Sequence, residues 1–184
     1  MPANVVPVIP PSLEFTDAQK PYVESIGGRR EPKVSPRRRH ALLQWRMAAQ
    51  LDQWARGRGE VGTEWRFYLL ESKGRSSSLV PDVAYVSFER LPRELPEDAR
   101  ERPRLAPDIA VEILSPGDSR TTLAEKIALY LRHGARVVIV LDPIARTLTQ
   151  HAADGVTTAE ARGSIAIREH AGLVLDADDL FANL

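Results

Sequence analysis

The sequence predicts an α/β fold in which a mixed β-sheet is flanked by helices. Amphipathic helical patterns alternate with groups of short apolar strands along the chain. The succession of strand, helix and strand over residues 108–141 is typical of a crossover that joins two parallel strands of one sheet. The length of 184 residues and the hydrophobic content of 43% suit one globular domain with a real core. We expect a single domain over residues 21–184, preceded by an irregular, proline-rich arm over residues 1–20.

The composition excludes several classes of site. The chain has no cysteine, so disulfides, thiolate catalysis and cysteine-based zinc sites are excluded, and any metal must be bound by oxygen or histidine. No apolar run approaches the roughly 20 residues that span a bilayer. The start of the chain also lacks the basic segment and the uninterrupted apolar stretch of an export signal. We therefore expect a soluble, cytoplasmic protein with no membrane partner.

The first helix is predicted within residues 35–58. Ser35 can cap it, Pro36 suits its first turn, and Gly57 and Gly59 end it. Its apolar residues recur at helical spacing, which predicts that they face the core. These residues are Leu43, Met47, Leu51 and Trp54.

Two strands and a long connection are predicted next. Residues 63–72 and 78–88 have strand character, and the polar residues between them predict a turn, so we expect a hairpin. Residues 89–107 are rich in proline, glutamate and arginine and show no period. This composition predicts a solvated connection to the next strand.

The second half of the chain starts with an apolar strand at residues 107–116 that looks buried on both faces. A helix follows, with Asp118 or Ser119 as its cap and Gly134 at its end. Residues 136–143 predict another buried strand. The remaining predicted elements are two strands around an Asp154–Gly155 turn, a strand at 164–170 and the C-terminal tail at 172–184.

Glu112 is the most informative residue, because it lies in the middle of the apolar strand "PDIAVEILSP". An ionised carboxylate does not belong there without a partner. Asp82 directly precedes another strand in "VPDVAYV", and two carboxylates on neighbouring strands can share a magnesium ion. Alternatively, Asp82 is a turn residue at a strand start. Asp108 lies roughly 13 Å from Glu112 along the strand and is expected to cap the strand entrance, while Asp142 is explained as a turn residue before proline.

Lys126 is the nearest lysine in sequence to Glu112. Phosphoryl chemistry needs a cation to activate the attacking water or to stabilise the charged transition state, whereas position 114, on the face of Glu112, is a leucine. Lys126 lies on the following helix beside Leu123, Ile127 and Tyr130, so its stem can be buried and its amine directed inward. The alternative is a solvated lysine at the edge of that helix face.

A basic cluster lies in the first half of the chain. Residues 1–80 contain 13 basic and 8 acidic side chains, whereas residues 81–184 contain 12 and 17. The positive excess is concentrated in the stretch "GGRREPKVSPRRRH". Such a cluster can follow a phosphate backbone, or it can be a solvated helix entrance. Its members are Arg29, Arg30, Lys33, Arg37, Arg38 and Arg39.

Taken together, these motifs resemble those of the Uma-two-type family of endonucleases from Tyr22 to Phe181. The family pattern has a glutamate before a turn glycine, a histidine at the start of the first helix, "PDV" before a strand, "PDLVVEVLSPS", a lysine in the next helix, "YLEAGVREYWLVDP" and an acidic "LDDLF" ending. This chain has "VESIGG", "RRRHALL", "PDVAYV", "PDIAVEILSPGD", "LAEKIALYLRHGARVVIVLDP" and "DADDLF" at the matching places. It departs from the pattern in its more basic stretch after Glu24 and in "VV" where the family has "YW".

The resemblance implies a restriction-endonuclease-like PD-(D/E)xK fold, with a central mixed β-sheet flanked by helices and additional C-terminal β-strands. It makes Asp82 and Glu112 the metal-binding acids. It makes Lys126 the catalytic lysine, displaced from strand to helix, and Glu24 an additional acid. His40 either assists this site or is a hydrogen-bonded core histidine.

The implied activity is hydrolysis of nucleic acid phosphodiesters, with DNA as the expected substrate and Mg²⁺ or Mn²⁺ as the cofactor. Cleavage of both strands of a duplex needs two sites, so a homodimer is expected. Two other interpretations stay open. The fold can persist as a catalytically silent module that binds nucleic acid or protein, or the acids can form a structural ion pair with Lys126 and bind no metal. The sequence contains no recognition helix or zinc module that would indicate a target.

Overall fold

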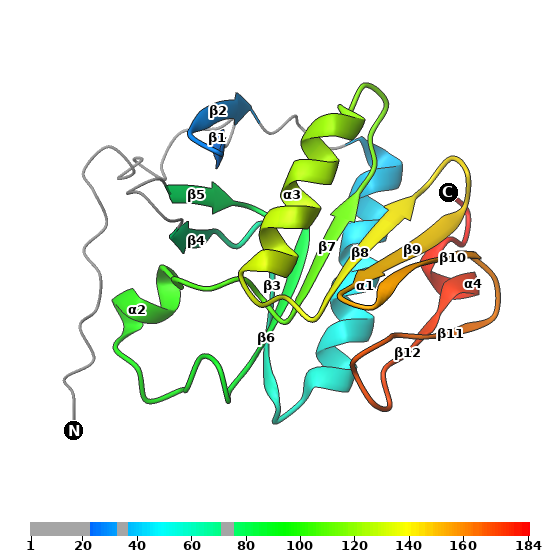
Figure 1. Cartoon of the computed structure of the whole chain (residues 1–184). Coiled ribbons are helices and arrows are strands. Elements are labelled where there is room, and N and C mark those ends of the chain that lie inside the picture. Colours follow the sequence, from blue (N-terminus) through cyan, green and yellow to red (C-terminus); the bar gives the residue numbers. More distant parts are fainter. Residues whose placement is uncertain (1–22, 33–36, 71–75) are drawn as a thin grey trace.

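The computed structural model describes residues 23–32, 37–70 and 76–184 (Figure 1). Its largest sheet has six strands, which are β3 (Gly59–Thr63), β6 (Val83–Ser87), β7 (Ile109–Ile113), β8 (Val137–Asp142), β9 (Thr147–Ala152) and β10 (Gly155–Glu160). Their order across the sheet is β10-β9-β8-β7-β6-β3. Strands β7 and β8 are parallel and every other neighbouring pair is antiparallel, so the sheet is mixed.

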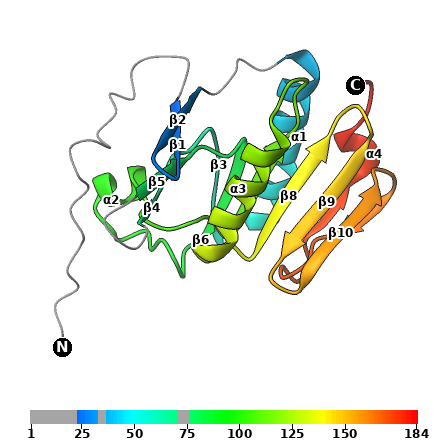
Figure 2. The same ribbon diagram turned by 45° about the horizontal axis from the view of Figure 1, so that its top comes forward.

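Helices α1 (Arg38–Ala55) and α3 (Arg120–Arg132) lie on opposite faces of this sheet (Figures 1 and 2). Side chains alternate between the faces of a strand, which sorts them into two cores. Val83 and Val111 pack in the core of α1, whereas Ala84 and Ala110 pack in the core of α3. Because Glu112 follows the even-numbered alternation, its side chain belongs to the α3 face.

A second sheet lies beside the α3 face. Its strands are β1 (Val23–Ile26), β2 (Arg29–Pro32), β4 (Phe67–Leu70) and β5 (Ser76–Leu79), all antiparallel in the order β2-β1-β5-β4. Ile26, Phe67 and Leu79 share one core with Leu129 and Tyr130 of α3. This packing holds β1 against α3.

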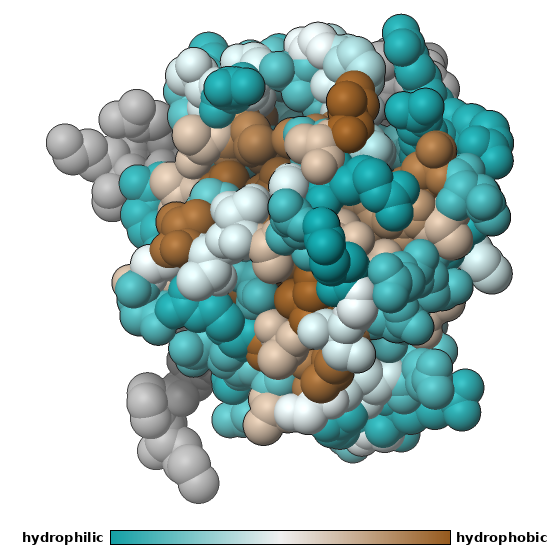
Figure 3. All heavy atoms as spheres, turned by 90° about the vertical axis from the view of Figure 1, so that its right-hand side faces the viewer, coloured by the Kyte–Doolittle hydropathy of each residue, from teal (hydrophilic) through white to brown (hydrophobic). Residues whose placement is uncertain are grey.

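The C-terminal segment closes the α1 side of the molecule. It consists of β11 (Ser164–Ala166), β12 (Val174–Asp176) and α4 (Ala177–Leu180). Leu180 and Phe181 are fully buried in the α1 core. Figure 3 views the molecule from the side on which these C-terminal elements lie in Figure 1, and its brown apolar side chains are interrupted by teal hydrophilic ones. Within the described residues, no helix is both long and apolar enough to cross a membrane.

The predicted fold class, a mixed sheet flanked by helices with added C-terminal strands, is confirmed. The crossover β7-α3-β8 is present, and the Ser119 side chain caps α3 by accepting a hydrogen bond from the Thr122 backbone N–H at 3.2 Å. The predicted N-terminal arm lies outside the described residues, so the domain boundary stays a prediction.

The structure corrects two local predictions. The first helix begins at Arg38, with Arg37 as its N-cap and no side-chain cap, whereas the predicted cap Ser35 lies outside the described residues. Residues 78–88 are not one strand: β5 and β6 belong to different sheets and are separated at Pro81, which has no N–H for a ladder. Residues 89–107 form the predicted connection, from β6 to β7, and include a short helix that was not predicted, α2 (Glu97–Glu101), none of whose residues is buried. Strand β3 was not foreseen either, because its two glycines are poor strand formers.

Candidate active site

Asp82 and Glu112 meet where β6 begins and β7 ends. The register pairs Val83 with Val111, and the next step of the same ladder places Asp82 opposite Glu112. The Asp82 backbone N–H donates to the Val111 carbonyl at 2.9 Å, and the Asp82 Oδ2 accepts from the Ile113 N–H at 2.6 Å. The Asp82 carboxylate thus continues the ladder past the first residue of β6. These hydrogen bonds fix its position, and only 3% of the residue is exposed.

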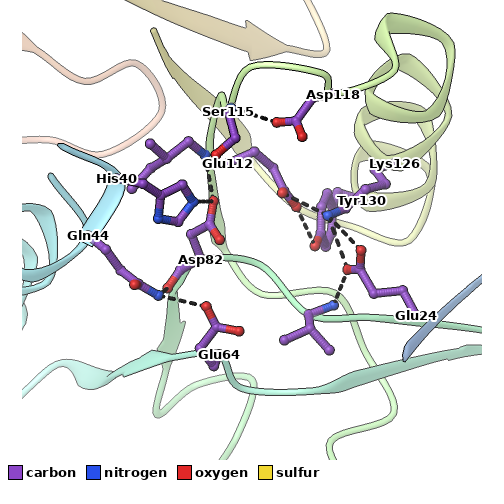
Figure 4. Close-up of polar contacts among 12 residues, drawn as sticks. Glu24, His40, Gln44, Glu64, Asp82, Glu112, Ser115, Asp118, Lys126 and Tyr130 are labelled. Carbon is purple, nitrogen blue, oxygen red and sulfur yellow. Dashed lines mark hydrogen bonds and ion pairs between the residues drawn. The ribbon is translucent and has the colours of Figure 1, made fainter. Parts of the chain in front are cut away.

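Glu112 is held by two donors from α3 (Figure 4). Its Oε2 lies 2.7 Å from the Lys126 Nζ, and its Oε1 accepts a hydrogen bond from the Tyr130 hydroxyl at 2.9 Å. Lys126 and Tyr130 are four residues apart, so they lie one above the other on a single face of the helix. Both are buried. The Glu112 carboxylate of β7 therefore accepts from one charged and one neutral donor of α3.

Glu24 reaches the same lysine from the second sheet. Its carboxylate lies 3.1 Å from the Lys126 Nζ, and its Oε1 also accepts from the Val80 N–H at 2.7 Å. Lys126 thus bridges two carboxylates that belong to different sheets. Of the residues that the resemblance assigns to the site, Lys126 contacts both Glu24 and Glu112 directly.

Helix α1 supplies two further polar groups. The His40 Nε2 lies 3.2 Å from the Asp82 Oδ2. The Gln44 Nε2, one turn later, donates to the Asp82 carbonyl at 2.9 Å and to the Glu64 Oε1 at 2.8 Å. His40 is buried in the core-facing stripe of α1 and also lines the cavity described below. His40 is therefore a buried histidine of the helix core, and it also contacts an acid of the candidate site.

The ionisation of the α3 donors follows from these contacts. Burial alone would lower the pKa of the Lys126 ammonium, but the charges of Glu112 and Glu24 outweigh burial, so this pKa lies above its ordinary value. Burial raises the pKa of the Tyr130 phenol well above its ordinary value, and the charge of Glu112 raises it further. At neutral pH, Lys126 is a cation and Tyr130 is a neutral donor.

These groups line a cavity of about 270 Å³. Within the described part of the chain, five carboxylates line it, against one lysine and one histidine. The acidic lining residues are Glu24, Glu31, Asp82, Glu112 and Asp118. A larger hollow of about 740 Å³ lies along β3 and α2, and there the Arg100 guanidinium pairs with Glu60.

The residues of the smaller cavity fit a hard divalent cation. The excess of carboxylate over cationic side chains leaves negative charge that a cation would neutralise, and carboxylate oxygens are the ligands that Mg²⁺ and Mn²⁺ prefer. The described residues hold no ready-made group of three acidic, histidine or cysteine side chains around one metal position. An ion held by Asp82 and Glu112 would therefore complete its coordination with water and substrate oxygens.

The basic cluster flanks the cavity from two elements. Arg29 and Arg30 lie on β2 next to the lining residue Glu31, while Arg37, Arg38 and Arg39 precede the lining residue His40 at the start of α1. The five described arginines are exposed. Arg29 pairs with Glu125 of α3 at 2.6 Å, and Arg38 donates to the Asn183 carbonyl at 3.4 Å. Lys33 lies outside the described residues.

Two other acids have the structural roles that the sequence predicts. Asp108 accepts from the Ser87 N–H at 2.8 Å and lies 3.3 Å from Arg90 and 3.4 Å from Arg136, so it anchors the entrance of β7. Asp142 accepts from the backbone N–H of the second and third residues after it, both at 2.8 Å, which is the expected turn.

Sequence reasoning missed Tyr130, Gln44 and Glu64. Tyr130 belongs to an apolar stripe in the sequence, and only the packing of α3 on β7 brings its hydroxyl to Glu112. The spacing of Gln44, four residues after His40, is a signal that could have found it, because both lie on one side of the helix. Glu64, with φ of 55°, has no such signal, since its place depends on the unforeseen strand β3.

Comparisons with known proteins agree with this architecture. The fold is similar to that in the crystal structure of a putative nuclease belonging to DUF820 from Anabaena variabilis ATCC 29413, with a TM-score of 0.77 and 24% identity over 89% of this chain and 91% of that one. No curated protein matches the sequence. Residues 11–173 match the model of the Uma2 family, described as "Putative restriction endonuclease". Because this match spans most of the chain, the protein belongs to the Uma2 family.

Proposed function

We propose that this protein is a metal-dependent endonuclease that hydrolyses phosphodiester bonds of DNA. The observation that carries the proposal is the bridge from Glu112 through Lys126 to Glu24, beside Asp82, in a cavity rich in carboxylates. Membership of the Uma2 family supports the same reaction class. The reaction consumes one water molecule, whose oxygen forms the new bond to phosphorus while the ester bond opposite breaks and the leaving oxygen takes up a proton.

In this proposal Asp82 and Glu112 hold Mg²⁺ or Mn²⁺. When bound, the ion supplies Lewis acidity toward water and phosphate. The backbone N–H of Ile113 and the hydroxyl of Tyr130 orient the two carboxylates, so little reorganisation is needed on binding. His40 holds Asp82 from the α1 side.

Lys126 would act on the scissile phosphate as a permanent cation. Its raised pKa excludes the role of a general base near neutral pH. Its ammonium can instead orient the attacking water by hydrogen bonding and offset the negative charge that grows on the phosphate. Glu24 gives this lysine a second carboxylate partner besides Glu112, which helps to hold the ammonium in place.

The nucleic acid would be held by the arginines that flank the cavity. Exposed guanidinium groups on β2 and at the start of α1 suit phosphates on either side of a scissile bond. Cleavage of both strands of a duplex requires a second copy of the site, so the proposal includes a homodimer.

Cleavage of supercoiled plasmid with Mg²⁺ or Mn²⁺ tests the proposal. Wild type is compared with Glu112→Gln and with Glu94→Gln, which changes an exposed glutamate outside the cavity. We expect Glu112→Gln to lower the cleavage rate at least about 100-fold, as the loss of an electrostatic catalytic group does. Glu94→Gln should cleave as fast as wild type.

Thermal unfolding with and without Mn²⁺ separates the other interpretations. A metal site predicts that Mn²⁺ raises the Tm of wild type and of Glu94→Gln but not that of Glu112→Gln. Binding of DNA without cleavage by wild type would indicate a silent module. No rise in Tm and no cleavage would indicate a structural ion pair and contradict the proposal.

A further inference from the structure

Trp45 is the most exposed large apolar side chain in the described part of the chain, at 69%. It lies on α1, on the face opposite the buried residues Leu43, Met47 and Leu51. Tryptophan presents a large apolar ring with one polar N–H, so an exposed indole on a helix is available to pack against a binding partner.

The neighbours of Trp45 leave its ring uncovered. The residues four positions before and after it, which flank it on the helix surface, are the exposed alanines Ala41 and Ala49. Within the described residues, Trp45 has no aromatic or cation–π partner, whereas Trp54 packs against Tyr85 and Trp65 packs against Phe67.

The exposed face of α1 that carries Trp45 also carries Arg38, a member of the basic cluster. Arg38 is seven residues before Trp45, which places it on the same side of the helix and about 10 Å away along the axis. Between them on the helix surface lie the exposed Ala41 and the half-buried Leu42. The opposite side of the same two turns carries His40 and Gln44 to Asp82. The exposed indole is thus fixed on the element that also borders the candidate active site.

We propose that Trp45 is a stacking platform for an unpaired nucleic acid base, with Arg38 holding a phosphate of the same strand. The proposal rests on the proposed nuclease function and adds its substrate class, which is DNA with a single-stranded segment. Both faces of a base inside a duplex are covered by its neighbours, so only an unpaired or terminal base can lie flat on the indole. Positive charge beside an aromatic ring matches the phosphate and the base of one strand.

Binding of labelled oligonucleotides in EDTA, which prevents cleavage, tests this proposal. One single strand and the blunt duplex of the same sequence are titrated with wild type, Trp45→Ala, Trp45→Phe and Ile144→Ala. Ile144 is a matched control because it is 65% exposed and lies outside α1. Loss of one stacked base typically costs about 1–3 kcal/mol, so Trp45→Ala should bind the single strand roughly 5- to 150-fold more weakly.

The duplex, the Trp45→Phe variant and tryptophan fluorescence show whether a loss of binding is due to lost stacking. Duplex binding by Trp45→Ala should stay within about twofold of wild type, which also reports that the variant is folded, and Trp45→Phe should keep part of the single-strand affinity. Wild-type tryptophan fluorescence should be quenched by the single strand, and Trp45→Ala should lose that change.

Equal single-strand binding by wild type and Trp45→Ala overturns the stacking proposal and leaves the nuclease proposal standing. A wild type that does not bind the single strand also overturns the stacking proposal, whereas the nuclease proposal is decided by the plasmid cleavage assay. If Trp45→Ala instead changes the molecular mass in sedimentation and not the single-strand affinity, the indole is covered by a second copy of the chain and the stacking proposal is wrong.

Discussion

Glu112 shows how one residue can place a charge in an apolar strand. Its two carboxylate oxygens contact different kinds of donor, the Lys126 ammonium and the Tyr130 hydroxyl. A carboxylate of this kind is costly to bury unless it is both paired and hydrogen-bonded. The cation compensates the charge, while the neutral phenol fixes the orientation of the group.

The first prediction concerns Tyr130→Phe. It removes one donor from Glu112 without changing the size of the buried ring, and we expect the free energy of unfolding to fall by about 1–3 kcal/mol. The rise in Tm caused by Mn²⁺ should also become smaller, because Glu112 is less firmly oriented. Urea denaturation measures the first effect. Tyr85→Phe is the control, since its hydroxyl lies 3.4 Å from the Arg58 carbonyl, and equal losses in both variants would contradict a special role of Tyr130.

The second prediction concerns Lys126→Met, which removes the shared cation and leaves two buried carboxylates facing each other. Breaking a buried ion pair from one side costs about 3–5 kcal/mol, so the variant should unfold at clearly lower urea concentration in EDTA. Mn²⁺ should restore more stability to this variant than to wild type, because no ammonium competes for the carboxylates. A variant as stable as wild type in EDTA would refute the prediction.

Helix α1 connects the core to the site. One side of the helix packs Leu43, Met47 and Leu51 under the sheet, and the same helix directs His40 and Gln44 at Asp82. The packing of the apolar side therefore determines where the polar side chains lie.

The third prediction is that Met47→Ala destabilises the protein by about 2–5 kcal/mol, because it leaves a cavity at a fully buried position. We also expect slower plasmid cleavage, since a looser helix holds Asp82 less well. Gln53→Ala on the exposed side of α1 is the control and should change the free energy of unfolding by less than about 0.5 kcal/mol. Measurement of unfolding and cleavage on the same samples checks both effects, and unchanged cleavage in a destabilised Met47→Ala would show that α1 does not position the site.

At the scale of the whole molecule, the site lies where two sheets meet. Glu24 comes from the four-stranded sheet, Glu112 from the six-stranded sheet, and Lys126 from the helix between them. The ion pairs join parts of the chain that lie 102 residues apart. Loss of charge at this junction should therefore affect the stability of the entire fold.

The fourth prediction follows from the raised pKa values of Lys126 and Tyr130. Both groups hold a proton more tightly when folded, so their contribution to stability is complete below the ordinary pKa values of about 10 and is lost as the pH rises through the folded values. We expect the free energy of unfolding to decrease above pH 10. Urea denaturation between pH 8 and about 11.5 measures it, and the decrease should be smaller for Lys126→Met, whereas identical slopes for the two proteins would contradict the assignment.

The sequence by itself determined the elements whose signals are local. The β7-α3-β8 unit, the Ser119 cap and the anomaly of Glu112 all follow from patterns within about 35 residues. The contiguous family motif around them was also sufficient to predict the fold class. Such features depend on periodicity and on local hydrogen bonds, which involve residues close together in the sequence.

Only the tertiary structure decided how distant segments pair. The break at Pro81, the edge strand β3 and the placement of Asp82 opposite Glu112 depend on partners that no local pattern identifies. The hydroxyl of Tyr130 could not be distinguished from an apolar side chain until α3 was packed on β7. The physical reason is that strand pairing and buried hydrogen bonds gain their energy from contacts across the chain, so the same short sequence has a different role with a different neighbour.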